Sequence, residues 1–378
     1  MTTLLQSELL GLTLQELTSL AESLGEPGFR ARQLFDALYR QRLTALEDIT
    51  TLPKSLRSRL VSLGYRTGFP TIDQRFVSAD GTVRYLVRFS DGQTVETVWM
   101  PEGDGVEDTE ELLPGSAVED SRLSSNAQNR RGTICLSSQS GCAVNCKFCM
   151  TALLGLQRNL SAGEILGQVL LVLNDHGMEI GRDRINLVFM GQGEPFLNYE
   201  NFIRAVRLLV AGVGISESRM TVSTSGIVQR IADFGREQVR PHLAISLNGS
   251  NDEVRERVMP INRKWNLASI LEVARGFPLR SRERLTFEYV LLSGVNDTPE
   301  NAREVVALLR EIRAKVNLIA LNPGPEIPFQ TPAASAVEAF QQILVAAGIP
   351  AYVRRPRGLD IYAACGQLKR TNGLTSIT

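Results

Sequence analysis

The sequence predicts an α/β protein whose main part is a partial barrel of six strand-helix units, preceded by a small helical domain and a β-meander linker. Three patterns indicate this order: helical periodicity up to residue 66, alternating segments with hairpin turns up to residue 101, and short apolar strands between helical segments from residue 132 onward. With 378 residues, 43% of them hydrophobic, the chain can build one large core and a smaller companion. We set domain limits at residues 1–69, 70–131, 132–355 and 356–378.

The helical domain covers residues 1–69. Apolar residues recur at spacings of three and four in TLQELTSLAESLG and FRARQLFDALYRQR, and Gly and Pro separate the helices. Between Arg30 and Arg66 the chain carries eight basic residues and three acidic ones. Such a face suits an RNA phosphate backbone, although solvation alone explains it about as well. We expect an accessory RNA-binding domain.

The linker begins with a three-stranded meander. Its alternating segments are separated by Asp80-Gly81 and Asp91-Gly92, and Asp-Gly is a strong hairpin-turn signal. The period of two places Glu96 on the same face as Val98 and Met100. A carboxylate among apolar neighbours is either an edge residue that reaches water or a group with a raised pKa that can accept a proton.

The rest of the linker, residues 103–131, is acidic and rich in Ser and Gly, and we expect a mobile insert there. Eight acidic residues and no basic ones lie between Glu102 and Asp120. Without them, 41 basic residues face 33 acidic ones, so the zero net charge does not exclude an RNA partner. A solvated mixed surface is the alternative.

The barrel is predicted from six apolar strands, each followed by a segment suited to a helix: TICLSS, INLVFM, MTVSTS, HLAISLN, LTFEYVLL and VNLIALN. Strand-helix alternation indicates a parallel sheet, which could be a partial barrel or a doubly wound sheet. Polar residues recur where these strands end, namely Gly193, Glu194, Ser223, Ser225, Ser246, Asn248 and Asn322. One Ser or Asn is usually a helix cap, but their recurrence at one edge favours a shared ligand site and a partial barrel.

Three cysteines follow the first barrel strand in the spacing Cys142-x3-Cys146-x2-Cys149. Structural zinc sites usually have four protein ligands, and iron-sulfur clusters are also normally held by four cysteines. Three ligands would leave one iron of a 4Fe-4S cluster open to bind a substrate or cofactor.

The N-terminus lacks a signal-peptide pattern and no run of eighteen apolar residues occurs, so we predict a cytoplasmic protein without a membrane partner. In that reducing compartment, clustered cysteines favour a metal or a catalytic site over disulfides.

The cysteine motif, with Phe148 before its third cysteine and GQGEP at residues 191–195, resembles the radical S-adenosylmethionine superfamily. The likeness narrows to the RlmN family of dual-specificity RNA methyltransferases, because ETVWMPE, CLSSQSGCAVNCKFC, MGQGEP, STSG, LAISLN, MPINRK, FEYVLL, GVND, LNP and AACGQL occur in that family's order. The resemblance implies a 4Fe-4S cluster on Cys142, Cys146 and Cys149, with S-adenosylmethionine at the open iron.

The resemblance also implies the reaction, methylation of C2 of adenine 2503 in 23S rRNA and of adenine 37 in tRNAs. Cys365 would take a methyl group from one S-adenosylmethionine. A radical formed from a second molecule would remove a hydrogen from that methyl group, and the carbon radical would add to C2. Glu96 matches the family's proton acceptor. Cys135 would then release the product and leave a transient disulfide with Cys365.

The residues that match the family's S-adenosylmethionine contacts are Gly193, Glu194, Ser223, Ser246, Leu247, Asn248 and Asn322. Asn248 departs from the pattern, since the family commonly has histidine there, and an amide cannot titrate. The family further implies 23S rRNA and tRNA as partners and a flavodoxin-type reductant. We expect a monomer.

Two alternatives stay open. Relatives of the resistance type methylate C8 of the same rRNA adenine by similar chemistry and share these motifs. A non-catalytic RNA adaptor could instead bind zinc through Cys135, Cys142, Cys146 and Cys149, although Cys135 lies in a predicted strand rather than in a metal-binding knuckle.

Overall fold

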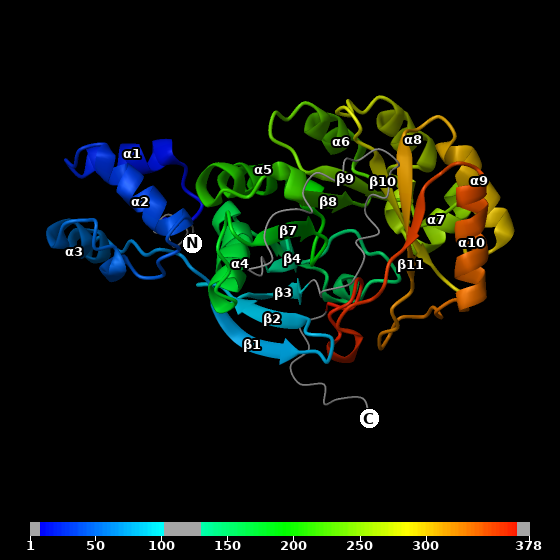
Figure 1. Ribbon diagram of the computed structural model, residues 1–378, viewed down its shortest axis with the longest axis horizontal. Coiled ribbons are helices and arrows are strands. Elements are labelled where there is room, and N and C mark those ends of the chain that lie inside the picture. The colour runs from blue at the N-terminus through cyan, green and yellow to red at the C-terminus, as the bar shows by residue number, and fades with distance from the viewer. Residues whose placement is uncertain (1–7, 102–129, 369–378) are drawn as a thin grey trace, which may run out of the picture.

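The computed structural model describes residues 8–101 and 130–368 and contains one ten-stranded sheet in the order β1-β2-β3-β4-β7-β8-β9-β10-β11-β12 (Figure 1). From β4 to β12 each strand pairs in parallel with the next one in this order. A doubly wound sheet would reverse its strand order, whereas this sheet does not. Its helices lie along the outer side of the curved sheet (Figure 1). The α/β class and the partial barrel are therefore confirmed.

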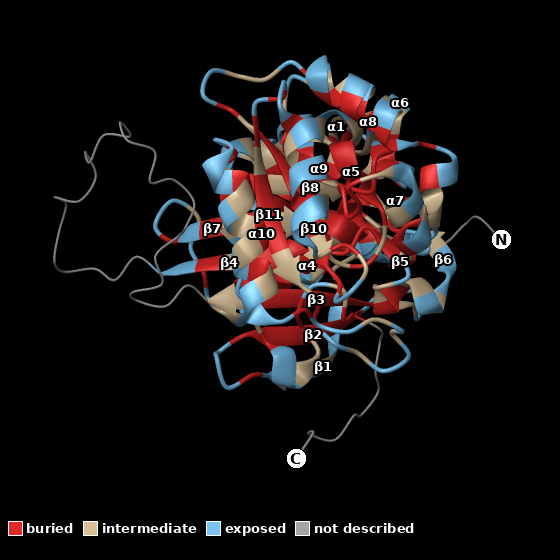
Figure 2. Ribbon diagram, turned by 90° about the vertical axis from the view of Figure 1, so that its right-hand side faces the viewer, coloured by how far each residue is buried: buried red, intermediate tan, exposed pale blue. Residues whose placement is uncertain are grey.

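The six predicted strand-helix units are all present. Their strands are β4 (Arg131–Cys135), β7 (Arg184–Phe189), β8 (Met220–Thr224), β9 (His242–Ser246), β10 (Leu285–Leu291) and β11 (Ala314–Ala320). Their helices are α4 (Ala162–Asp175), α5 (Tyr199–Leu208), α6 (Val228–Gly235), α7 (Asp252–Val258), α8 (Leu267–Arg275), α9 (Pro299–Leu309) and α10 (Ala334–Ala346), and the unit that begins with β9 contains two of them, α7 and α8. A short further strand that the sequence did not predict, β12 (Ala351–Val353), extends the sheet beside β11. The strands are largely buried, and the helices expose their outer faces (Figure 2).

The meander is present as β1 (Thr71–Val77), β2 (Val83–Arg88) and β3 (Thr94–Pro101), paired antiparallel. Strand β3 also pairs antiparallel with β4, so the meander continues the barrel sheet. The C-terminal segment docks on its first turn, where Asp80 accepts a hydrogen bond from the Gly358 backbone at 3.0 Å. The predicted insert lies almost wholly outside the described residues, and so do residues 369–378.

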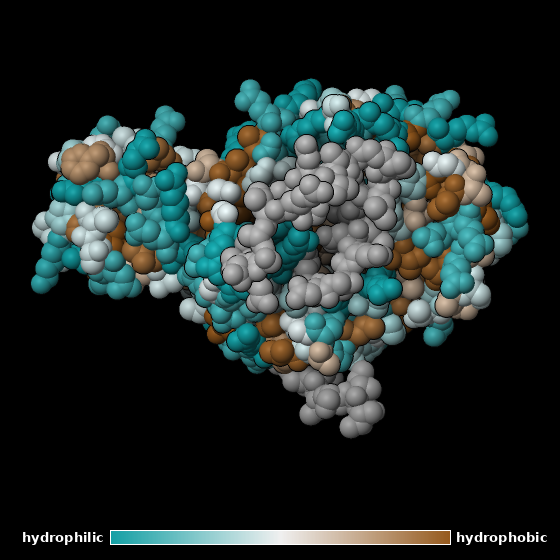
Figure 3. Space-filling model, in the orientation of Figure 1, coloured by the Kyte–Doolittle hydropathy of each residue, from teal (hydrophilic) through white to brown (hydrophobic). Residues whose placement is uncertain are grey.

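The N-terminal helices are α1 (Leu14–Ser23), α2 (Phe29–Tyr39) and α3 (Lys54–Ser62), and they stand to one side of the barrel (Figure 1). Tyr39 at the end of α2 binds the segment that precedes α1, because its hydroxyl donates to the Leu12 carbonyl at 2.7 Å. Arg204 on α5 donates to the Gly11 carbonyl at 2.8 Å and so joins this unit to the barrel. The face of these helices seen in Figure 3 is mostly hydrophilic.

Buried apolar side chains pack against both the meander and the barrel part of the sheet. A cluster of aromatic rings packs between α5, α6 and the sheet, and the rings of Phe189 and Phe202 meet edge to face at 4.9 Å. On the meander, the Trp99 ring stacks on His176 at 4.4 Å. No helix among the described residues combines the length and the apolar character that a membrane crossing requires. The limits of the four predicted domains stay a prediction.

Candidate active site

One cavity opens at the carboxyl ends of the parallel strands, where the sequence predicted the ligand site. Residues from the cysteine loop, from the ends of β7 to β11 and from the C-terminal segment line it together. The predicted site residues on its wall are Cys142, Cys146, Cys149, Gly193, Glu194, Ser223, Ser246, Asn248, Asn322 and Cys365. Leu247, Cys135 and Glu96 are buried and are absent from this wall.

The cysteine loop is held on a hairpin that the sequence did not reveal. Strands β5 (Gln139–Gly141) and β6 (Leu156–Asn159) flank the loop and pair antiparallel in a separate two-stranded sheet. The loop also contacts two other segments. Lys147 donates its backbone N–H to the Val258 carbonyl on α7 at 2.9 Å, and Met150 donates to the Gly366 carbonyl at 2.7 Å.

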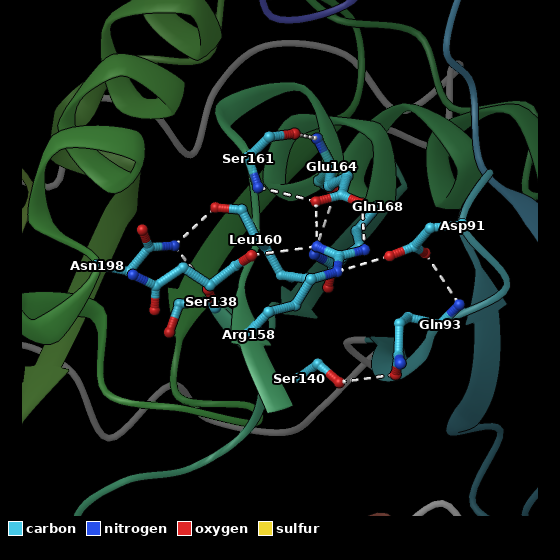
Figure 4. Close-up of polar contacts among 11 residues, drawn as sticks. Asp91, Gln93, Ser138, Ser140, Arg158, Leu160, Ser161, Glu164, Gln168 and Asn198 are labelled. Carbon is cyan, nitrogen blue, oxygen red and sulfur yellow. Dashed lines mark hydrogen bonds and ion pairs between the residues drawn. The ribbon is translucent and has the colours of Figure 1, made fainter. Parts of the chain in front are cut away.

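Arg158 fixes this hairpin to the rest of the protein (Figure 4). Its guanidinium donates two parallel hydrogen bonds to Glu164 on α4, at 2.7 and 2.8 Å, and a third to Asp91 in the β2–β3 turn at 2.7 Å. Glu164 also caps its own helix with Ser161. The Arg158 guanidinium therefore joins the hairpin to α4 and to the β2–β3 turn.

The Gly193-Glu194 turn is built against the same hairpin. Gly193 has φ +97°, and a Cβ there would lie 2.5 Å from the side chain of Gln139. Gln139 accepts the Glu194 backbone N–H at 2.9 Å and donates to Asn159 at 2.7 Å, so one buried amide spans the hairpin and the turn. Burial raises the pKa of the Glu194 carboxyl, which accepts the Ser225 backbone N–H at 2.7 Å.

Ser223 and Ser246 meet a carboxylate that sequence reasoning missed. The Ser223 hydroxyl donates to Glu288 on β10 at 2.5 Å and lies 3.4 Å from the Ser246 hydroxyl. Burial raises the pKa of Glu288, which lines the cavity. Its place within an apolar strand motif gave no signal of this contact.

The two candidate asparagines are bonded within the protein. Asn248 has φ +54°, and its side-chain oxygen accepts the Val290 backbone N–H at 2.8 Å while its amide lies 3.1 Å from the Met259 sulfur. Asn322 donates to the Cys365 carbonyl at 3.0 Å. Both amides therefore position the cavity wall, and Asn322 also holds the segment that carries Cys365.

Cys365 lines the cavity, whereas Cys135 is buried outside its wall. Cys135 lies at the end of β4 in an apolar cluster with Val98 on β3 and Ala363 in the C-terminal segment. Burial, and then the nearby Cys365 thiol, raise the pKa of Cys135. Cys365 is exposed and lines the cavity, where the surrounding protein and Glu288 raise its pKa to about 11. All five cysteines are free thiols.

Glu96 differs from its expected surroundings. It faces the same side as Val98, as the period of two predicts, and it is buried. It does not stand alone among apolar groups, because it forms an ion pair with the buried Arg84 and accepts a hydrogen bond from Gln192 at 3.1 Å. Arg84 itself stacks on the Phe76 ring at 4.2 Å. Cross-strand neighbours thus supply the charge that the sequence pattern could not show.

The donor set fits the two groups that the sequence implies. Burial raises the pKa of the Cys142, Cys146 and Cys149 thiols, and bound iron holds such groups as thiolates. Within residues 8–101 and 130–368 no three His, Cys, Asp or Glu side chains are grouped to hold a metal ion, but each thiolate of a cubane cluster binds a different iron. The buried Ser225 hydroxyl on the cavity wall has no hydrogen-bond partner among the described residues, which suits a polar ligand.

Comparisons with known proteins agree with this geometry. Residues 136–306 match the model of the radical SAM superfamily, and residues 7–64 match that of the ribosomal RNA large subunit methyltransferase N-terminal domain. The chain is 63% identical to a probable dual-specificity RNA methyltransferase RlmN of Koribacter versatilis, over 94% of this chain and 99% of the relative. A dual-specificity RNA methyltransferase RlmN of Anaeromyxobacter dehalogenans is 43% identical, over 97% and 92%.

Among solved structures, a radical SAM methyltransferase from Sphaerobacter thermophilus superposes with a TM-score of 0.84 at 40% identity. The alignment covers 96% of this chain and 99% of that one. The likeness therefore extends over the helical domain, the meander and the barrel together.

Proposed function

The chain belongs to the RlmN family of dual-specificity RNA methyltransferases, and on that premise we propose which of its residues carry the reaction. It is a radical S-adenosylmethionine enzyme that methylates RNA, and its family name fits C2 of adenine 2503 in 23S rRNA and of adenine 37 in tRNAs. Membership of an enzyme family excludes the zinc adaptor, and the dual-specificity relatives favour C2 over C8. The observation that supports the roles of the cysteine loop, the strand-end residues and Cys365 is the cavity that they line together.

Cys142, Cys146 and Cys149 would hold the 4Fe-4S cluster, and S-adenosylmethionine would lie against the residues at the strand ends. When bound, these two groups supply the electron transfer and the radical that substitution at an electron-poor aromatic carbon requires. The Glu194 carboxylate and the Ser225 hydroxyl offer polar partners on the wall that the cysteine loop also lines.

Cys365 is the proposed methyl carrier, because its thiol is exposed and lies on the cavity wall. Two contacts fix its segment: Asn322 binds the Cys365 carbonyl, and Met150 of the cysteine loop binds the Gly366 carbonyl. The carrier is thereby attached to the loop that would hold the cluster.

Cys135 and Glu96 are proposed to complete the reaction. Glu96 would take the proton from C2, and Gln192 links its carboxylate to the Gly193-Glu194 turn. Once deprotonated, Cys135 would attack the Cys365 sulfur: the disulfide forms, the sulfur–carbon bond breaks, and its electron pair stays with the product carbon, which takes up a proton to become the methyl group. Cys135 packs in one apolar cluster with Ala363, two residues before Cys365, which supports this pairing.

Two cysteine variants test these roles in anaerobically reconstituted protein. We expect Cys365→Ala to keep iron and sulfide and to lose all methyl transfer. We expect Cys135→Ala to accumulate a covalent protein–RNA adduct. On a denaturing gel the adduct should run as a slower band, and ribonuclease treatment should decrease its apparent mass. Normal turnover by Cys135→Ala without an adduct would contradict the release step. Mass spectrometry of the wild-type product separates 2-methyladenosine from 8-methyladenosine.

The electron donor, the role of the helical domain, the cellular location and the oligomeric state are also proposals. A flavodoxin-type protein is the proposed electron donor, since the reaction needs single electrons. The basic residues between Arg30 and Arg66 support RNA binding by the helical domain. A cytoplasmic location follows from the RNA substrates, and a monomer stays our expectation.

A further inference from the structure

Arg255 on α7 is a completely buried arginine between the cysteine loop and the strand ends. Its guanidinium forms no ion pair with the residues that the structure describes, and all of its hydrogen bonds go to neutral oxygens. Asp252, one turn earlier, is the carboxylate that acts on it electrostatically. That carboxylate is occupied by the Leu267 backbone N–H at 2.9 Å and the Asn262 amide at 3.0 Å.

The guanidinium joins the ends of two barrel strands. It donates to the carbonyls of Ser225 at 2.6 Å, Leu247 at 2.9 Å and Ser246 at 3.2 Å, which follow or end β8 and β9. These residues border the proposed S-adenosylmethionine site. The chain passes so closely here that a Cβ on Gly249 would lie 2.6 Å from the Arg255 backbone. A single side chain therefore sets the spacing of this edge.

The same helix contacts the cysteine loop at its other end. Val258 accepts the Lys147 backbone N–H at 2.9 Å, and Cys146 packs against the buried apolar cluster that includes Val258 and Met259. Arg255 precedes Val258 by three residues, so the guanidinium and the contact with the cysteine loop lie one helical turn apart on α7. Helix α7 thus places one cation between the strand ends and a proposed cluster ligand.

An isolated buried charge is costly, and hydrogen bonds to neutral carbonyls offset only part of the desolvation. Burial lowers the pKa of Arg255 to about 10, so it remains a cation at neutral pH. An anionic centre at the loop would supply the missing counter-charge.

We propose that Arg255 is a positioning residue that fixes the ends of β8 and β9 against the cysteine loop and raises the reduction potential of the cluster through its uncompensated positive charge. The proposal rests on the cluster ligands proposed above. Reduction adds a negative charge to the cluster, and a nearby cation in a low-dielectric site stabilises that state more than the oxidised one. The effect should be independent of RNA.

The experiment is a redox titration of the reconstituted full-length protein, monitored by electron paramagnetic resonance, without RNA and with or without S-adenosylmethionine. We expect Arg255→Met to shift the midpoint potential to more negative values. Arg255→Lys keeps the charge but not the planar fork, so its potential should stay near that of the wild type while the spectral change on adding S-adenosylmethionine weakens. Arg257→Met, which removes an exposed charge from the same helix, is the matched control and should shift neither readout.

An unchanged potential in Arg255→Met, or an equal shift in Arg257→Met, would overturn the proposal. If Arg255→Met does not retain its cluster, Asp252→Asn decides, because it removes the nearby negative charge and keeps an oxygen for the Leu267 N–H. We expect a shift to less negative potential, and no shift would refute the charge effect. If the reconstituted wild-type protein contains no iron and sulfide, the proposed cluster ligands are wrong. If it contains the cluster but the potentials do not shift, only the proposed role of Arg255 is wrong.

Discussion

Two arginines flank the cysteine loop, and the protein holds them in opposite ways. Arg158, on the hairpin side, has a side chain 28% exposed and pairs with two carboxylates, Asp91 and Glu164. Arg255, on the α7 side, is 0% exposed and binds only neutral oxygens. The hairpin is thus held by charge near the surface, whereas the strand ends are held by hydrogen-bond geometry inside the core.

This difference shows which side can tolerate change. An ion pair near water is weakened by salt and replaced partly by hydration, so its loss is limited. A buried donor that serves several carbonyls has no such substitute, since each carbonyl left without a donor keeps its desolvation cost. The α7 side should therefore be the rigid side of the site, and the hairpin the adjustable one.

The largest effect should come from replacing each arginine by methionine. Arg255→Met leaves buried carbonyls without donors at about 1–3 kcal/mol each, so we expect a stability loss on the order of 3 kcal/mol or more. Arg158→Met leaves the buried Glu164 carboxylate without its cation, but the Ser161 backbone N–H still donates to it and Asp91 is exposed, so we expect a smaller loss of about 2 kcal/mol. Urea unfolding of both variants measures the free energies. A larger loss for Arg158→Met would reverse the comparison.

Replacing each arginine by lysine should change the stability less, and it separates the contribution of the positive charge from that of the guanidinium geometry. Arg158→Lys keeps the charge but loses the two-pronged contact with Glu164, and we expect a loss of about 1 kcal/mol that shrinks in 1 M salt. Arg255→Lys should lose stability by an amount that does not depend on salt. Arg88→Lys is the matched control, because Arg88 pairs with Asp73 on the same meander at 2.6 Å without contacting the hairpin. Salt dependence for both sites would remove the distinction between them.

The smallest effect concerns Asp91 and pH. Partial burial opposes ionisation, but hydrogen bonds from Arg158 and the Gln93 backbone outweigh it and hold the pKa of Asp91 below its usual value. A lowered folded-state pKa contributes stability above the ordinary value of about 3.9, and this contribution disappears as the pH falls through the folded-state pKa. Because the Asp91 side chain is 41% exposed, we expect Asp91→Asn to cost only about 0.5 kcal/mol at pH 6, and this cost should shrink as the pH falls below about 3.9.

Unfolding free energies of the wild type and Asp91→Asn across that range provide the check. The amide oxygen still accepts the Gln93 N–H, so the turn is kept and only the charge is removed. A difference that stays constant with pH would show that the carboxylate's charge contributes nothing.

Local patterns predicted the elements of this site, and long-range polar contacts escaped them. The cysteine spacing and the recurring strand-end residues are short-range signals, and every residue that they singled out lies on the cavity wall. Arg158 contacts Asp91 across 67 residues, and Ser223 contacts Glu288 across 65, so no periodicity records either pair. The complete burial of Arg255 also runs against the usual exposure of its residue type.

Glu96 illustrates both halves of this lesson. The alternation of strand β3 assigned it to the correct face, because register along one strand is a local property. Its partner Arg84 stands on the neighbouring strand, diagonal to it in the β2–β3 ladder, and only the pairing of the strands reveals that contact.

The pairing of β3 with β4 has a practical use in protein engineering. Pro101 stands opposite Gly132, and Val98 stands opposite Cys135, although a long stretch of sequence connects the two strands. Since the ladder fixes both ends of that stretch, a peptide tag or a small reporter domain spliced into it would leave the register of Glu96 and Cys135 unchanged. The enzyme could then be immobilised or labelled without cysteine chemistry, which its thiols would not survive.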